Sequence, residues 1–245
     1  MKFQSNKALK LKLPISEMFV SLAGEGLDIG KPSLFIRIMG CPKPWCRYCD
    51  TKYAREIPSN DFIEKEGLSI NTLCADVVRA SVGHVTVTGG NPLYYVKEVR
   101  SLVKLLKSCG FFVTLQEKGQ CYDKETWETV DCVDFDVKTP FTGIESNLDL
   151  VSKLRPGKDY LKFLIASLRD FEFFKKFLIS VYPKCEGLTC VLQPGIRPFE
   201  NEENMWQRLK LIVDFVLKSG LSEKVDIRIL PQLHKQLFGM RKRGV

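Results

Sequence analysis

The amino-acid sequence predicts an α/β fold built on a parallel β-sheet of six to seven strands. Short runs rich in β-branched and aromatic residues alternate with segments of helical periodicity. A repeated order of strand, helix and strand favours parallel strands joined by right-handed crossovers. Such a sheet is one or two strands short of a closed eight-stranded barrel. We therefore expect an open, partial β/α barrel or a doubly wound sheet.

The predicted strands are apolar runs bounded by turn-forming or charged residues. They span 33–39, 84–89, 111–116, 132–137, 160–166, 189–193 and 225–230. Between them, apolar residues recur every three or four positions near 95–108 and near 202–218, which predicts amphipathic helices. Gly110 and Gly220 follow these two helices, at the position where a left-handed cap ends a helix.

Unusual motifs stand at the ends of five predicted strands. Three cysteines follow the first strand, and TGGNP ends the second. The motifs DFDVKTP, LQPG and LPQLH end later strands. In parallel α/β folds, ligands bind at the carboxyl ends of the strands. The five motifs therefore predict a single active site at that edge.

Composition narrows the class of protein. The chain has 245 residues and no repeat or linker that divides it, so we expect one domain over 1–245. No run of eighteen apolar residues predicts a membrane span. The net charge is +8, but the basic residues are scattered, which favours a small anionic substrate over nucleic acid. Nine cysteines without an export signal favour a reducing cytoplasm over a disulfide scaffold.

The three clustered cysteines lie in the stretch MGCPKPWCRYCD, as Cys41, Cys46 and Cys49. A structural zinc site takes four protein ligands, and the two histidines of the chain, His84 and His234, are remote in sequence. An iron–sulfur cubane held by three thiolates leaves one iron open, and an open iron can bind a reactant directly. The cluster therefore favours iron–sulfur chemistry, with zinc as the alternative.

With these motifs, the chain resembles the radical S-adenosylmethionine (SAM) enzymes and, among them, the 7-carboxy-7-deazaguanine synthases. The resemblance covers nearly the whole chain and is carried by SEMFVSLAGEGLDIGKPSLFIRIMGC, CRYCDTKYA, HVTVTGGNPL and RILPQLHKQLFGMRKRGV. It implies an open, partial β/α barrel of radical SAM type. It also implies a carbon–nitrogen lyase that converts 6-carboxy-5,6,7,8-tetrahydropterin to 7-carboxy-7-deazaguanine with loss of ammonia, in 7-deazapurine biosynthesis for tRNA modification.

The resemblance implies two cofactors at the cysteine cluster. Cys41, Cys46 and Cys49 would hold a [4Fe–4S] cluster, and its open iron would bind the amino and carboxylate groups of SAM. An electron from the cluster would cleave SAM to methionine and a 5′-deoxyadenosyl radical. Residues that match SAM contacts in the family are Tyr48, Gly90, Asp136, Val137, Lys138, Gln193, Pro194, Gly195 and Ile196.

The resemblance also implies a substrate site, a Mg²⁺ ion and partners. Positions that match pterin contacts are Leu22, Ala23, Gly24, Arg37, Thr88, His234 and the terminal carboxylate of Val245. Thr51 matches a magnesium ligand. A guanidinium such as that of Arg37 suits a planar carboxylate because it donates two parallel hydrogen bonds. The family further implies an external one-electron donor and a homodimer.

Several features have simpler interpretations or depart from the family pattern. Arg37 could form an ordinary ion pair on its strand, Thr51 could cap a helix, and His84 is expected to be structural. Four single cysteines are expected to fill the core, namely Cys74, Cys109, Cys121 and Cys132. The gap between the first two clustered cysteines is four residues instead of the common three, Ala23 replaces the usual glutamine, and Gln116 stands where a glutamate is common. The alternative functions are another radical SAM enzyme, such as a glycyl-radical activating enzyme, and a zinc-dependent nucleic-acid-binding protein.

Overall fold

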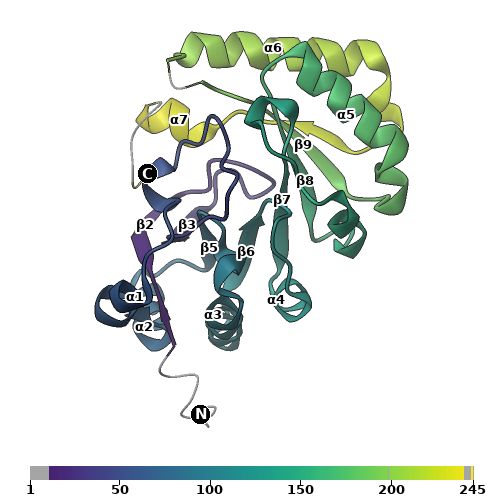
Figure 1. Ribbon diagram of the computed structural model, residues 1–245. Coiled ribbons are helices and arrows are strands. Elements are labelled where there is room, and N and C mark those ends of the chain that lie inside the picture. Colours follow the sequence, from purple (N-terminus) through teal and green to yellow (C-terminus); the bar gives the residue numbers. More distant parts are fainter. Residues whose placement is uncertain (1–10, 198, 240–243, 245) are drawn as a thin grey trace.

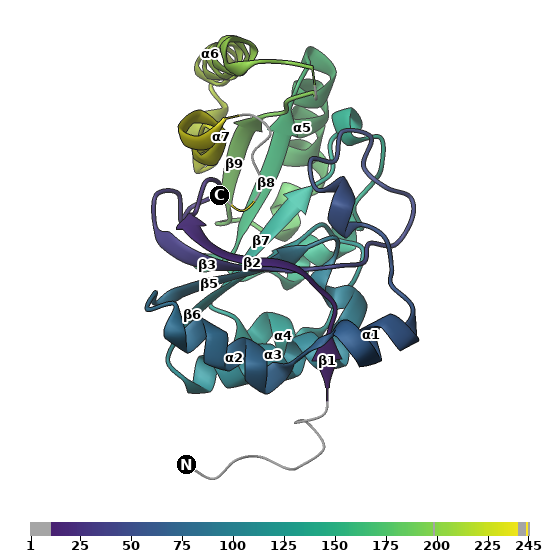
Figure 2. The same ribbon diagram turned by 90° about the vertical axis from the view of Figure 1, so that its left-hand side faces the viewer.

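Eight strands form one curved sheet in the computed structural model, which describes residues 11–197, 199–239 and 244 (Figures 1 and 2). The strand order is β10-β9-β8-β7-β6-β5-β3-β2. The strands are β2 (Ile15–Leu22), β3 (Pro32–Ile38), β5 (His84–Gly89), β6 (Phe112–Glu117), β7 (Cys132–Val137), β8 (Tyr160–Ile165), β9 (Thr189–Pro194) and β10 (Ile227–Ile229). From β3 to β10 every neighbouring pair is parallel. Because β2 and β10 are the two edges of the sheet, the barrel is open.

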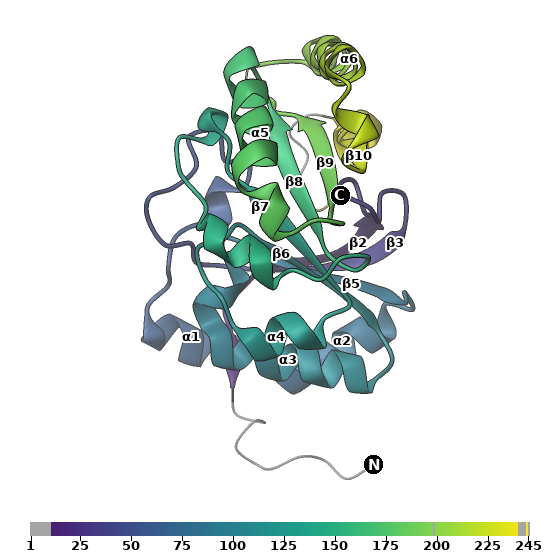
Figure 3. The same cartoon turned by 90° about the vertical axis from the view of Figure 1, so that its right-hand side faces the viewer.

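Helices cover the outer face of this sheet. Figures 1 and 3 show α1 to α4 gathered beneath the first half of the sheet and α5 and α6 beside the second half. Strand residues such as Val85 and Val87 meet helix residues such as Val99 and Leu102 in one buried core. The helices are α1 (Asn60–Glu66), α2 (Ile70–Arg79), α3 (Val96–Ser108), α4 (Lys124–Thr129), α5 (Leu168–Ser180), α6 (Glu202–Ser219) and α7 (Leu233–Phe238).

Smaller elements complete the chain. A two-stranded sheet joins β1 (Lys12–Leu13) to β4 (Leu68–Ser69). Short 3-10 turns are η2 (Lys52–Ala54), η3 (Pro92–Tyr95), η4 (Pro140–Thr142), η5 (Leu148–Lys153), η6 (Tyr182–Lys184) and η7 (Leu221–Glu223). Two of these turns, η3 and η4, begin shortly after β5 and β7, at the end of the TGGNP and DFDVKTP motifs. Within the part of the chain that the structure describes, none of the helices combines the length and apolar character needed to cross a bilayer.

The seven predicted parallel strands are all present, and the two predicted helices are α3 and α6. Gly220 ends α6 with a left-handed φ of 65°, and Gly110 follows α3 with a φ of 87°. The prediction missed β2, which pairs antiparallel with β3. Its alternation is interrupted by a register shift between Ile15 and Glu17 and its residues are mostly half-buried, so the sequence carries no clean period of two.

The four single cysteines differ in their burial. Cys74 and Cys132 are buried, as predicted, whereas Cys121 is half-buried. Core filling is wrong for Cys109, which is exposed at the end of α3. The helix pattern places position 109 just beyond the last buried turn, so an apolar sequence neighbourhood did not mean a buried side chain.

Candidate active site

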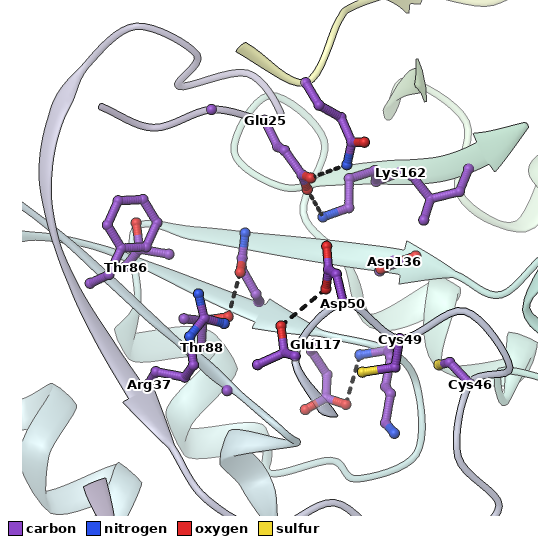
Figure 4. Close-up of a pocket in the computed structure, with 18 of the residues that line it drawn as sticks. Glu25, Arg37, Cys46, Cys49, Asp50, Thr86, Thr88, Glu117, Asp136 and Lys162 are labelled. Carbon is purple, nitrogen blue, oxygen red and sulfur yellow. Dashed lines mark hydrogen bonds and ion pairs between the residues drawn. The ribbon is translucent and has the colours of Figure 1, made fainter. Parts of the chain in front are cut away.

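One cavity of about 260 Å³ lies at the carboxyl ends of the parallel strands (Figure 4). Its walls come from the loop after β2, the cysteine loop after β3, the ends of β5 to β8, and the start of α7. Cys41, Cys46 and Cys49 all line this cavity. The fold therefore brings the cysteine motif and the later strand-end motifs to one place, as expected for a parallel sheet.

The cysteine loop is fixed at its start by backbone pairing. Gly40 turns the chain out of β3 with a φ of 101°, and its N–H donates to the carbonyl of Ala54 at 2.8 Å. The N–H of Cys41 donates to the carbonyl of Arg55 at 2.9 Å. The two ends of the loop are thus held side by side, and Cys41 is buried while the other two cysteines are half-buried.

The longer gap between the first two cysteines places a tryptophan in the cavity wall. The indole N–H of Trp45 donates to the carbonyl of Cys41 at 2.8 Å. The guanidinium of Arg55 lies 4.1 Å from the Trp45 ring centroid, and the Lys43 ammonium lies 5.0 Å from it. These cation–π contacts hold the indole beside the cysteines. The four-residue gap between Cys41 and Cys46 therefore contains a tryptophan that packs against the cysteine loop.

The chemistry of the donor set fits a multi-iron cluster better than one metal ion. Across residues 11–197 and 199–239, no three Cys, His, Asp or Glu side chains lie together as ligands of a single ion. A closed zinc site is therefore not formed by the described residues. In a four-iron cluster each thiolate binds a different iron, so its ligands stand further apart than those of one ion.

A glycine cradle follows β5, beside the cysteine loop. A β-carbon at Gly90 would lie 2.3 Å from the carbonyl oxygen of Gly40 and 2.8 Å from that of Ala54. One at Gly89, where φ is 139°, would lie 2.1 Å from the carbonyl oxygen of Ile38. Only glycine fits at these two positions, and the cavity wall here is bare backbone. Such a wall suits the backbone-like amino and carboxylate groups of SAM.

The end of β7 adds a charged pair with a free acceptor. Lys138 Nζ lies 2.7 Å from Asp136 Oδ2, and the lysine is buried. Burial alone would lower the pKa of Lys138, but the Asp136 carboxylate outweighs it and raises that pKa. In the described chain, the buried Oδ1 of Asp136 has no hydrogen-bond partner. Because a buried oxygen normally has a partner, this one fits a donor on a bound ligand.

Nearby, Tyr48 stacks on Phe141 with ring centroids 4.8 Å apart.

A second charged network lines the opposite wall of the cavity. Lys162 Nζ lies 3.0 Å from Glu25 Oε2, and Gln232 donates to Glu25 Oε1 at 2.5 Å (Figure 4). Lys162 Nζ also lies 2.9 Å from Asp134 Oδ2. Burial would raise the pKa of Glu25, but the charges of Lys162, His234 and Lys235 hold it well below its usual range. Burial raises the pKa of Asp134, although Lys162 opposes that shift. Glu25 is therefore a carboxylate at neutral pH, aimed into the cavity.

Two further side chains of β3 and β5 face the cavity. Arg37 Nε forms an ion pair with Glu17 Oε1 at 2.7 Å, and the Tyr53 hydroxyl donates to the same oxygen at 2.6 Å. Thr88 donates to Gln116 at 2.5 Å. The ion-pair interpretation of Arg37 is thus correct, and the residue also lines the cavity. The carboxylate of Glu17, which pairs with Arg37 across the two strands, holds the guanidinium in place and leaves its terminal nitrogens facing the cavity.

The structure brings most of the predicted site residues to this cavity: Leu22, Ala23, Gly24, Arg37, Cys41, Cys46, Tyr48, Cys49, Thr51, Thr88, Gly90, Asp136, Lys138, Ile196 and His234. Val137, Gln193, Pro194 and Gly195 are buried and do not line it. Gln193 instead donates to the carbonyl of Pro231 at 2.9 Å. Val245 lies outside the described residues.

Two of the simpler interpretations are tested by the local contacts. Thr51 stands at the N-cap position of η2, but its hydroxyl caps no backbone group there and donates to Asp50 Oδ1 at 3.0 Å. His84 is buried between the hydroxyls of Ser33 and Thr114, at 2.6 and 2.9 Å, so it is structural as expected. His84 also lines the cavity.

Sequence reasoning missed several residues of the cavity wall: Glu25, Asp50, Lys118, Tyr160, Lys162, Gln232 and Lys235. It also missed Asp134, the buried partner of Lys162. Two signals were available. Glu25 lies in the same loop as Gly24, and the charged side chains of Asp134 and Lys162 interrupt apolar strand sequences. A charge inside a strand that is otherwise apolar needs a buried partner, and each of these charges is the partner of the other.

Residues 22–156 match the family model of a 4Fe-4S single cluster domain. A 7-carboxy-7-deazaguanine synthase of Methanospirillum hungatei is 32% identical over 224 residues, which are 91% of this chain and 84% of that protein. The chain belongs to the 7-carboxy-7-deazaguanine synthase family. Another family member, from Pyrobaculum aerophilum, is 31% identical over 93% of this chain and 96% of its own length.

Members of this family are radical SAM enzymes, so the family supplies the cluster and SAM that the donor set and the glycine cradle fit. The crystal structure of QueE from Escherichia coli superposes with a TM-score of 0.66 over 92% of this chain and 98% of that one, at 23% identity. That likeness concerns the fold. It agrees with the open, partial β/α barrel that the alternating strands and helices predicted.

Proposed function

We propose that the protein converts 6-carboxy-5,6,7,8-tetrahydropterin to 7-carboxy-7-deazaguanine and ammonia. The observation that carries this proposal is the single cavity that the three cysteines share with the glycine cradle, Arg37 and the Glu25–Lys162 pair. The atoms of the reaction balance with ammonia as the second product, and no net oxidation or reduction occurs. An active site for this reaction must therefore initiate a rearrangement and hold the pterin ring in place.

The cysteine side of the cavity would hold the cofactors. Cys41, Cys46 and Cys49 would bind the cluster, and the bare backbone at Gly90 with the free oxygen of Asp136 would bind SAM. When bound, the cluster and SAM would supply one-electron chemistry: the cluster would pass an electron to SAM, and a hydrogen atom would be removed from the substrate. Tyr48, fixed by its stacking on Phe141, would lie along the adenine.

The opposite side would hold the pterin. Its ring carries several N–H donors on one edge and a carboxylate on another. The Glu25 carboxylate, which Lys162 keeps ionised, accepts hydrogen bonds from the N–H edge. Arg37 uses Nε for Glu17, so its two terminal nitrogens can take the substrate carboxylate. Gly24 permits the close approach of His234, because a β-carbon at Gly24 would lie 2.2 Å from His234 Nδ1.

A Mg²⁺ ion would bind at Thr51 with water and the substrate carboxylate. The hydroxyl of Thr51 is one oxygen donor, and the adjacent Asp50 carboxylate lies 3.0 Å from it. Mg²⁺ keeps much of its water, so few protein ligands suffice. We further propose a single domain over 1–245, a cytoplasmic location, an external one-electron donor and a homodimer, on the basis of the family resemblance and the continuous sheet.

The test is an anaerobic assay of reconstituted protein with SAM, dithionite, Mg²⁺ and the carboxytetrahydropterin, followed by mass spectrometry. The unsubstituted protein should release 7-carboxy-7-deazaguanine. Cys46→Ala should release none and should retain less iron. Cys109→Ala is the matched control, because Cys109 is exposed and does not line the cavity. If SAM is cleaved while the pterin stays intact, the substrate assignment is wrong.

A further inference from the structure

A buried lysine contacts one of the cluster cysteines. Lys118 follows β6 and is only 7% exposed. Its Nζ lies 2.7 Å from the sulfur of Cys41. Among the described residues, no carboxylate forms an ion pair with this lysine. A buried cation is costly unless an anion compensates it, and a cysteine that binds a cluster iron does so as a thiolate, so this contact suits a cluster ligand.

The loop that carries Lys118 is fixed on both sides of the residue. The Glu117 side chain accepts the backbone N–H of Lys118 at 2.9 Å, and the carbonyl of Lys118 accepts the Ser146 hydroxyl at 2.8 Å. Gly119 then turns the chain with a φ of 73°, packed against Phe135. The backbone of Cys41 is itself held by the cysteine loop. The lysine–sulfur contact therefore joins two restrained segments.

We propose that Lys118 is a positioning residue that raises the reduction potential of the iron–sulfur cluster through its contact with Cys41. This inference rests on the proposed function, because it requires the cluster. Reduction transfers one electron from the external donor to the cluster, so the reduced state carries one more negative charge. A cation and an N–H donor at a ligand sulfur stabilise that state more than the oxidised one. Lys118 thereby makes the first electron transfer easier.

The test is potentiometric titration of the anaerobically reconstituted protein, followed by the electron paramagnetic resonance signal of the reduced cluster. Lys118→Met keeps the chain length and removes both the donor and the charge. It should reduce the fraction of reduced cluster about tenfold at a fixed potential, which lowers the midpoint by about 59 mV. Lys118→Arg, which keeps both, should stay near the unsubstituted value. Lys97→Met removes an exposed charge on α3 and should change nothing.

The outcomes are separable. An unchanged midpoint in Lys118→Met with a full complement of iron would overturn the proposal. A shift seen only after SAM is added would also overturn it, because the lysine would then act on SAM. Where Lys118→Met does not retain iron, Lys118→Gln keeps a neutral donor, and its midpoint must fall between those of the Met and Arg variants. A shifted midpoint in protein that leaves the pterin intact would support the inference and refute only the substrate assignment.

Discussion

The buried pair of Lys162 with Asp134 and Glu25 gives a quantitative prediction for Lys162→Met. The lysine side chain is 5% exposed, Asp134 is fully buried, and Glu25 is 20% exposed. The variant removes the cation of this trio and leaves two carboxylates facing one another. Asp134 cannot recover water, whereas Glu25 can do so in part.

The magnitude follows from that difference in burial. Removal of one partner from a buried ion pair costs about 3–5 kcal/mol of unfolding free energy. In a chain of this size about 1 kcal/mol lowers the melting temperature by about 2–4 °C, so the expected loss is about 6–20 °C. Without Lys162, the pKa of Asp134, which burial already raises, rises further above that of the unfolded chain. Stability of the variant is then lost as pH rises, so its deficit is largest near pH 7 and shrinks toward pH 4.

The assay is thermal unfolding followed by circular dichroism at several pH values. Lys65→Met is the matched control, because its ion pair with Asp61 is mostly exposed and contributes little. Adding Asp134→Asn to Lys162→Met should recover part of the loss by removing the uncompensated charge. A Lys162→Met protein that melts with the unsubstituted protein at pH 7 would refute the reasoning, as would a deficit that grows toward low pH.

Three other substitutions test separate parts of the site. Gly90→Ala should cost about 1–3 kcal/mol and abolish SAM binding in equilibrium dialysis, since its β-carbon would meet the carbonyl of Gly40. Gly83→Ala, with open space around it, is its control and should melt normally. Burial raises the pKa of Glu117 from 4.5 to about 7. The folded protein therefore favours the protonated form of Glu117, so its contribution to the free energy of unfolding is full below pH 4.5 and is lost as pH rises through about 7. Glu117→Gln should remove that loss, about 3 kcal/mol, from urea unfolding measured between pH 5 and 8. Thr51→Val should raise the Mg²⁺ concentration needed for product formation several-fold, and an unchanged Mg²⁺ titration would exclude Thr51 as a ligand.

Much of the parallel sheet could be predicted because its strands are continuous apolar runs. Such runs are typical of strands covered on both faces, and the intervening helices show clear periodicity. The strand β2 was missed because it is an edge strand with half-buried residues and a register shift. The motifs at the carboxyl ends could be assigned to one site because parallel topology alone brings those ends together.

The charged side of the cavity could not be predicted in the same way. Asp134, Lys162 and Gln232 are separated from Glu25 by more than a hundred residues, and no local pattern states that they meet. Their pairing depends on the order of the strands and on the loop from β2 to β3 reaching across the open side. Lys118 illustrates the same limit, since 77 residues separate it from Cys41 and only the fold reveals their contact.

The loop at Glu25 has a consequence for how the protein is made. Its ion-pair partner Lys162 lies 137 residues later, and its hydrogen-bond partner Gln232 lies 207 residues later. Gly24 likewise accepts the backbone N–H of Leu233 at 2.9 Å. On the ribosome, this early loop must wait for nearly the whole chain to emerge before the cavity can close. The substrate side of the cavity is therefore the last part of the site that can form during synthesis.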